Sequence, residues 1–172
     1  MLETHVQLHV HGGNGSEPVH AEPVGDRRYR VLSSPGFVLG VAAGDEIELS
    51  GEDGRFLVLQ RGGNLAVQLF SKEPVRSFRE SLAAKVRDTL NGVLDGGIER
   101  GLVFTIPIET GFDAVDAFFD RVVKEIPGTE WMYGNVYDPE TGSPLGWWNS
   151  PSADADKRRI KWNQIWRRLT GR

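Results

Sequence analysis

The sequence predicts an α+β fold in which a half built of short strands precedes a half that mixes strands and helices. Two observations lead to this prediction. The first 62 residues contain short runs that alternate apolar and polar residues, separated by Gly, Pro, Asp and Ser. From residue 63 onward, two stretches repeat apolar residues every three or four positions, as amphipathic helices do. A chain of 172 residues fits one domain, or two small ones that share a core.

Five strands are expected in the first half. The first runs from Thr4 to Val10 and places Val6, Leu8 and Val10 on one face, the period of a half-buried strand. Turns rich in glycine and aspartate separate the four others, at residues 19–24, 28–32, 46–49 and 55–60. Short strands at this spacing favour a small antiparallel, β-barrel-like sheet, which we expect to form a first domain over residues 1–62.

A second domain, over residues 63–150, is expected to hold both helices. The helix at 77–91 carries apolar residues at every fourth position, and Asn91-Gly92 fits its C-terminal end. The second helix runs from 113 to 126, where Pro127 and Gly128 stop it. Four strands flank the helices, at residues 65–70, 93–98, 102–108 and 130–138. The order βαββαβ is that of a ferredoxin-like half, with both helices on one face of an antiparallel sheet.

The last 22 residues, 151–172, are expected to form a basic amphipathic helix from about Ala153 to Leu169. Its apolar stripe repeats at i, i+3, i+4 and i+7 and comprises Trp162, Ile165, Trp166 and Leu169. Burial of that stripe favours packing of the helix on the body. The alternative is that this helix inserts into a partner.

Charge is distributed unevenly along the chain. Residues 151–172 hold seven basic and two acidic residues, a net charge of +5, whereas the first 150 hold 13 basic and 22 acidic residues, a net charge of −9. An acidic body repels phosphate, which argues against nucleic acid as the main ligand. A regulator that binds nucleic acid through the basic helix remains an alternative.

Composition excludes several chemistries. The chain has no cysteine, so disulfides, thiolate metal sites and cysteine nucleophiles are absent. No apolar run reaches about 18 residues, and the first residues lack the basic and apolar blocks of a signal peptide, so we expect a cytoplasmic protein. Ser33 and Ser34 precede Pro35 in a turn, without the Gly-x-Ser-x-Gly elbow of serine hydrolases.

Turn and core residues between Ala21 and Phe70 form a distinctive series. The series is Ala21-Glu22-Pro23-Val24-Gly25, Tyr29-Arg30-Val31-Leu32, Pro35-Gly36-Phe37, Gly44-Asp45-Glu46-Ile47-Glu48 and Gly62-Gly63-Asn64-Leu65. It resembles a family of small bacterial proteins classed as a domain of unknown function, with a small β domain before a ferredoxin-like half. The resemblance is clear over about 50 residues and fades toward Tyr137. It supplies no catalytic residues, and its likeness to immunity proteins encoded beside toxins implies binding.

Histidines offer one candidate for metal chemistry. His5, His9 and His11 share a face of the first strand, and alternate strand residues lie about 6.6 Å apart, so a pair could hold one metal ion with a third ligand. The nearby candidates for that ligand are Glu17, His20 and Glu22. A metal-dependent enzyme that uses this face is therefore the alternative to a binding protein. Without a convincing third ligand, we assign no metal, cofactor or catalytic residue.

Two groups of side chains are candidates for partner binding. The second helix carries carboxylates at i, i+3 and i+7 on one side, a stripe that suits a basic protein surface or a divalent cation: Asp113, Asp116 and Asp120. The last strand carries alternating rings that would form an interaction platform if their face is open: Trp131, Tyr133 and Tyr137. Otherwise the β domain or the terminal helix covers these rings.

Together these features predict a non-catalytic protein-binding module. Its expected form is an immunity-type protein that neutralises a cognate, basic toxin by occluding the active site of the toxin. The sequence does not decide whether the chain is an enzyme, and it leaves open its oligomeric state and the identity of the partner.

Overall fold

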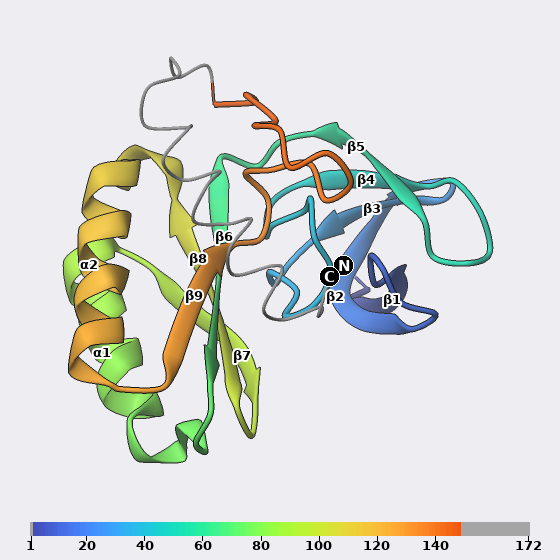
Figure 1. The fold of residues 1–172 in the computed structure, drawn as a ribbon. Helices are drawn as coiled ribbons and strands as arrows, with labels where there is room; N and C mark the ends of the chain where they lie inside the picture. The colour runs from blue at the N-terminus through green and yellow to red at the C-terminus, as the bar shows by residue number, and fades with distance from the viewer. Residues whose placement is uncertain (1, 149–172) are drawn as a thin grey trace.

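The computed structural model describes residues 2–148, which form two antiparallel sheets and two α-helices (Figure 1). The predicted α+β class is therefore confirmed. The terminal helix expected at 153–169 lies outside the described residues. None of the helices in the described range is long and apolar enough to cross a membrane.

The first sheet is a meander in which each strand pairs with the next along the chain. Its strands are β1 (Thr4–His9), β2 (Ser16–Gly25), β3 (Arg28–Val31), β4 (Glu46–Leu49) and β5 (Phe56–Gln60). The sheet curls, and the His9 N–H donates to the Gly54 carbonyl at 2.9 Å, close to the start of β5. It does not close into the expected barrel, because β1 and β5 do not pair. The five expected strands are all present.

Alternation explains the core of this first half. Residues that point inward from the strands form one apolar cluster with two valines of the loop between β3 and β4. The strand residues are Val6, Leu8, Val19, Val31 and Ile47, and the loop residues are Val38 and Val41. Polar side chains on the outer face of the same strands form ion pairs across neighbouring strands. Arg30, for example, donates to Glu22 at 2.9 Å and to Glu46 at 2.6 Å.

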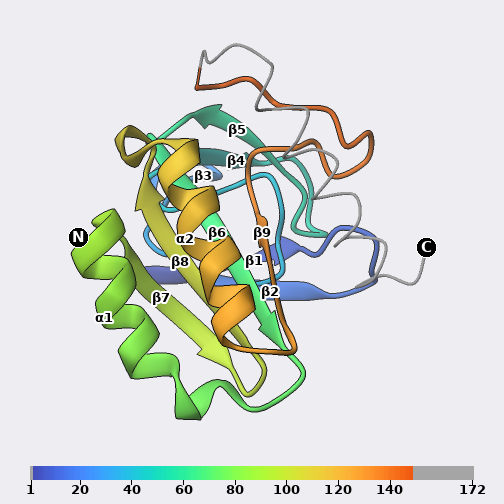
Figure 2. The same cartoon turned by 60° about the vertical axis from the view of Figure 1, so that its left-hand side comes forward.

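The second sheet has the strand order β7-β8-β6-β9, with antiparallel neighbours throughout. Its strands are β6 (Asn64–Ser71), β7 (Val93–Ile98), β8 (Gly101–Pro107) and β9 (Thr129–Tyr133). Helix α1 (Arg79–Leu90) connects β6 to β7, and α2 (Phe112–Glu125) connects β8 to β9. Short 3-10 turns, Val75–Ser77 and Ile108–Thr110, lead into the two helices. Figure 2 shows both helices on the same face of this sheet.

Helix spacing accounts for the core under α1 and α2. Helix α1 buries residues at i, i+4 and i+8, namely Leu82, Val86 and Leu90. It ends at Asn91, which adopts the left-handed conformation with φ of 53°. Helix α2 buries a wider stripe, Phe112, Val115, Phe118, Phe119 and Val122. Both stripes pack on the side chains that β6 and β8 direct to that face.

The last strand is shorter than expected, because it ends at Tyr133 rather than at residue 138. Beyond it, the Asn135 side chain takes the place of a backbone partner for β6. Asn135 Oδ1 accepts from the Ala66 N–H at 2.9 Å, and Asn135 Nδ2 donates to the Asn64 carbonyl at 2.8 Å. Because the Asn135 side chain bonds to the backbone of β6, the chain after Tyr133 turns away from the sheet. The alternation of apolar residues therefore predicts too long a strand.

The two sheets meet through polar contacts made by the loop between β3 and β4. Asn64 Nδ2 donates to the Ala43 carbonyl at 2.8 Å, and Gln68 Nε2 donates to the Pro35 carbonyl at 3.2 Å. The buried Asp45 carboxylate accepts from Arg61 Nη1 at 3.0 Å and from the Gly62 N–H at 2.8 Å. This loop therefore joins the two halves on the face of the second sheet that α1 and α2 leave uncovered.

Candidate functional site

Two of the three aspartates of α2, Asp113 and Asp120, are exposed and Asp116 is half-buried, and buried side chains donate hydrogen bonds to Asp116 and Asp120. Asp113 is exposed in the first turn of the helix. Asp116 Oδ1 accepts a hydrogen bond from the Tyr133 hydroxyl at 2.7 Å. Asp120 Oδ1 accepts from Trp131 Nε1 at 3.0 Å. Trp131 lies 11 positions after Asp120 in the sequence, and Tyr133 lies 17 positions after Asp116. The fold brings the members of each pair into contact.

The three rings form a platform only on condition that their face is open, and that condition is not met, because all three are buried. Trp131, Tyr133 and Tyr137 are 1%, 3% and 1% exposed. Trp131 and Tyr133 point from β9 toward the helix layer, where Trp131 packs on Phe119 with a centroid distance of 5.3 Å and Tyr133 packs on Phe112 at 5.5 Å. The alternation of residues along a strand predicts that these rings share one face of the sheet. It does not predict whether the helices cover that face.

Tyr137 also departs from the expected strand. It lies beyond the end of β9, in an isolated bridge with Pro144. It therefore belongs to the buried cluster of the second half and not to the row that Trp131 and Tyr133 form.

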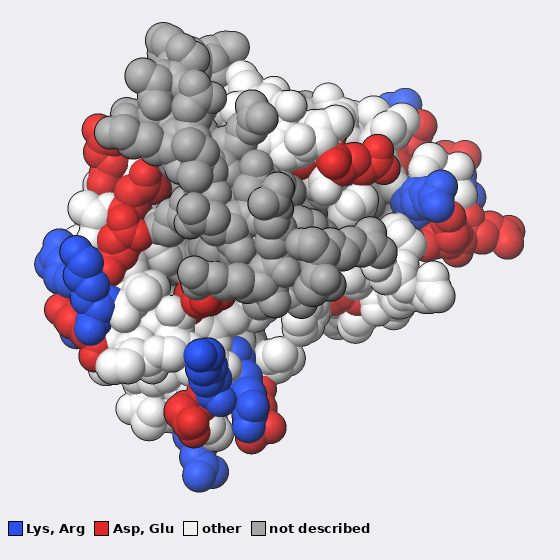
Figure 3. All heavy atoms as spheres, in the orientation of Figure 1, with Lys and Arg blue, Asp and Glu red and all other residues white. Residues whose placement is uncertain are grey.

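Hydrogen bonds from buried side chains therefore fix the positions of two carboxylates on α2, those of Asp116 and Asp120. Figure 3 shows acidic side chains gathered over the upper part of α2, on the left of the view. The indole and the phenol each occupy one carboxylate oxygen from the buried side. Such an arrangement holds negative charge at defined points along a helix, which suits recognition of a basic protein surface.

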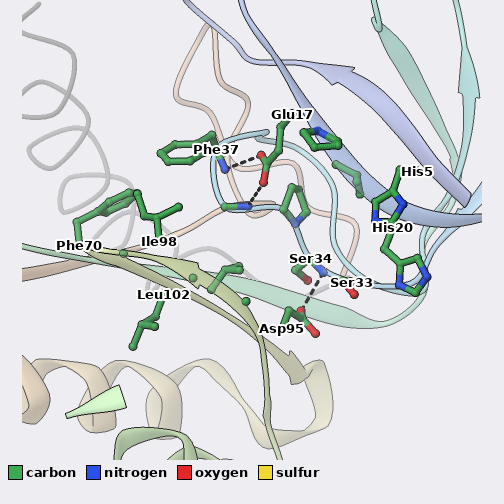
Figure 4. A pocket seen from close by; sticks show the side chains of 18 residues that line it. His5, Glu17, His20, Ser33, Ser34, Phe37, Phe70, Asp95, Ile98 and Leu102 are labelled. Carbon is green, nitrogen blue, oxygen red and sulfur yellow. Dashed lines mark hydrogen bonds between the residues drawn. The ribbon is translucent and has the colours of Figure 1, made fainter. Parts of the chain in front are cut away.

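A second candidate site is a cleft of about 400 Å³ between the two sheets. That volume lies within the range of small-molecule pockets. In Figure 4, His5 and His20 lie at one end, Phe70 and Ile98 at the other, and the Asp95 carboxyl lies between them. The cleft thus combines an apolar end with a polar middle.

Asp95 owes its position to a β-bulge. The register between β7 and β8 shifts between Leu94 and Gly96, so Asp95 is the extra residue of the bulge. Its Oδ2 accepts from the Ser34 N–H at 2.8 Å and from the Thr105 hydroxyl. Because Thr105 uses its only hydroxyl hydrogen on Asp95, the Ser34 hydroxyl donates to Thr105 Oγ1, at 2.5 Å. Burial raises the pKa of Asp95, although the hydrogen bonds from Thr105 and Ser34 oppose that shift.

Glu17 shapes the rim of the cleft. Its carboxylate accepts from three successive backbone N–H groups, those of Gly36 at 2.7 Å, Phe37 at 2.8 Å and Val38 at 3.0 Å. These bonds attach the loop after β3 to strand β2 and leave the Phe37 side chain 44% exposed at the cleft. The sequence gives no signal for this contact beyond the presence of a carboxylate on a strand.

The histidines are not arranged as the alternative of a metal-dependent enzyme would need. His5 pairs with His20 across β1 and β2, and their rings stack with centroids 5.3 Å apart. His20 Nε2 lies 3.0 Å from Glu3 Oε2. His9 lies opposite Ser16, away from that pair. Within residues 2–148, no three His, Asp or Glu side chains are grouped so that they could hold a metal ion.

Comparisons with known proteins bear on the family and the fold. A family model described as "Domain of unknown function (DUF4265)" matches residues 17–127. Among solved structures, the chain is similar to a hypothetical protein from Neisseria gonorrhoeae, with a TM-score of 0.60 and 14% identity over 78% of this chain and 95% of that one. At this identity the likeness concerns the fold alone. The search of curated proteins found no match. The resemblance to an uncharacterised domain family is thereby confirmed.

Proposed function

The chain belongs to the DUF4265 family of domains of unknown function, and we propose that it is a cytoplasmic, non-catalytic protein-binding module. In its specific form, the proposal is an immunity-type protein. It neutralises a cognate toxin by placing the acidic surface of α2 over a basic active-site cleft, so that substrate no longer enters. We also infer a ferredoxin-like class for the second half, which the strand order β7-β8-β6-β9 with helical connections after β6 and β8 supports.

One observation carries the functional proposal: the acidic stripe of α2 is built on the core. Tyr133 and Trp131 donate to Asp116 and Asp120 from buried positions, which restricts the rotamers of both carboxylates. A side chain that is already ordered loses less conformational entropy on binding than a free one. Fixed charges of one sign therefore favour a partner whose opposite charges have a matching spacing.

The charge of the whole chain supports the same class of partner. The first 150 residues carry a net charge of −9. A surface potential of one sign steers an oppositely charged partner and raises its association rate, whereas it repels nucleic acid. A basic toxin that acts on nucleic acid would have a cleft of the complementary charge.

The test has two stages. The tagged full chain is used to capture proteins from its native host, and the main basic protein that copurifies is then expressed alone and together with this chain. We expect growth arrest in the first case and normal growth in the second. A captured partner that leaves growth unchanged when expressed alone would refute the immunity-type function.

Charge-neutral variants then locate the surface. Changing Asp113, Asp116 and Asp120 together to Asn removes three charges and keeps the acceptor oxygens that Tyr133 and Trp131 need. Changing three exposed glutamates elsewhere to Gln removes the same charge: Glu52, Glu73 and Glu140. We expect the Asn variant to lose protection and the Gln variant to keep it. Equal protection by the two variants would exclude the α2 surface.

A further inference from the structure

We propose that the cleft between the two sheets binds a primary ammonium group carried on an apolar stem. The inference is independent of the proposed function, because the cleft lies on the face of the second sheet opposite α1 and α2. Val103, which lines the cleft, is followed along β8 by Phe104, which points to the opposite face and packs in the core under the helices.

The formal charge of the cleft is negative. The described residues that line it include two carboxylates, Glu17 and Asp95, and neither Lys nor Arg. The Glu17 carboxylate already accepts three backbone N–H groups. Asp95 is therefore the carboxylate with capacity for a ligand. The bonds from the Ser34 N–H and the Thr105 hydroxyl both end on Asp95 Oδ2.

The position of Asp95 is fixed in advance of binding. The bulge in β7 directs its side chain into the cleft, and Ser34 and Thr105 hold Oδ2 in place. A carboxylate that is largely removed from water, with no cation beside it, gains more from an ammonium group than an exposed one does. The raised pKa of Asp95, caused first by burial, agrees with this lack of a compensating charge.

An apolar surface adjoins the carboxylate. Phe37 and Ile98 are 44% and 52% exposed, and both line the cleft together with Phe70. Large apolar side chains that stay in contact with water in a pocket are available to cover an alkyl chain. Figure 4 places Phe70 and Ile98 at the end of the cleft away from the histidines, with Asp95 between the two groups. A ligand with a charged head and an alkyl stem matches this division.

Two sources can supply this chemistry, a free alkylamine and a lysine side chain on a peptide. The test titrates the full chain with n-hexylammonium, with N-acetyl-lysine methylamide and with neutral 1-hexanol, at constant pH and ionic strength. Backbone amide shifts in NMR spectra report binding at Ser34, Gly96 and Gly97, which line the cleft. We expect saturable shifts with at least one of the two ammonium probes and weaker binding of hexanol. Tighter binding of hexylammonium identifies a free amine as the ligand, and tighter binding of the lysine probe identifies a side chain.

Variants separate recognition from a general loss of structure. Asp95→Asn keeps an acceptor oxygen for Ser34 and Thr105 but removes the charge, and we expect about a tenfold or greater loss of affinity for the ammonium probes. Ile98→Ser should weaken hexylammonium binding by shortening the apolar wall. Glu80→Gln, with a side chain 91% exposed on α1, is the control and should bind as the wild type does. Absence of saturable shifts, equal affinity in Asp95→Asn, or hexanol binding as tight as that of hexylammonium would overturn the proposal.

Discussion

Tyr133 donates its hydroxyl hydrogen to Asp116 Oδ1 at 2.7 Å, from strand β9 to helix α2. The Tyr133 ring is buried against Phe112, and this packing holds its hydroxyl in place. The hydroxyl in turn holds the Asp116 carboxylate. Trp131 and Asp120 repeat the arrangement one turn further along α2. The proposed interaction surface is in this sense an extension of the packing between β9 and α2.

Removing the Tyr133 hydroxyl should therefore destabilise the fold through Asp116. A hydrogen bond to a charged group contributes about 1.5–3 kcal/mol, and we expect Tyr133→Phe to lower the free energy of unfolding by about that amount in urea titrations. Asp116→Asn keeps the acceptor and should cost less. An equal loss in the two variants would contradict this expectation, because it would show that the hydrogen bond stabilises the packing only when Asp116 is charged.

Glu17 should stabilise the loop at the cleft more than its own strand. Glu17→Ala leaves the amides of Gly36, Phe37 and Val38 without their acceptor, and each hydrogen bond to a charged group contributes up to about 1.5–3 kcal/mol, less where water can replace the acceptor. We expect faster hydrogen exchange at these amides, measured by NMR, and little change in β2. Glu17→Gln retains one acceptor oxygen and should have an intermediate effect. Unchanged exchange rates in Glu17→Ala would contradict the role assigned to this carboxylate.

The charge on Asp95 should oppose folding at neutral pH. Burial raises its pKa in the folded protein, so the folded state holds the proton more tightly than the unfolded chain does. Stability is then lost as the pH rises from about 3.9, the usual value, through the raised pKa. We expect Asp95→Asn to have a higher melting temperature than the wild type near neutral pH, with the difference shrinking as the pH falls toward 4.

Comparison of the two proteins at each pH isolates this effect. The pKa of Asp45 is also raised by burial, but Asp45 is present in both proteins and its contribution cancels in the difference. A variant whose deficit in stability grows as the pH rises from about 4 would mean that the hydrogen bonds of the ionised carboxylate outweigh its desolvation.

The junction between the sheets depends on the close approach of two glycines. A Cβ on Gly62 would lie 2.3 Å from the carbonyl carbon of Gly44, which is backbone and cannot swing aside. We expect Gly62→Ala to destabilise the fold by about 3 kcal/mol or more, measured by chemical denaturation. Gly15→Ala is the matched control, because a Cβ there has no atom within 4 Å, and it should be nearly neutral. Similar stabilities of the two variants would refute the close packing at Gly62.

Local patterns predict the elements of this fold well. Strands β4 and β7 span the expected residues, Glu46–Leu49 and Val93–Ile98, and each follows closely on a glycine, Gly44 or Gly92. Helix α2 begins and ends within one residue of the expected 113–126. Asn91 ends α1 as expected, since asparagine tolerates the left-handed conformation. Each of these features is decided by neighbours along the chain.

The sites depend on contacts between distant residues, which one sequence does not reveal. Ser34 and Asp95 are 61 positions apart, and the bulge that brings them together has no mark beyond Gly96-Gly97. The α2 aspartates were expected at the surface as a stripe, but their bonds to Trp131 and Tyr133 follow from the pairing of β9 with β6. The same pairing buries the rings that the sequence presented as a platform.

The measurement that tests the central proposal most directly is the affinity of the captured partner for three forms of the full chain. These are the wild type, the variant with Asp113, Asp116 and Asp120 changed to Asn, and the Glu52, Glu73 and Glu140 to Gln control. We expect at least about tenfold weaker binding of the Asn variant, mainly through slower association, and a difference that shrinks as salt is raised. Equal affinity of the Asn variant and the control would contradict it.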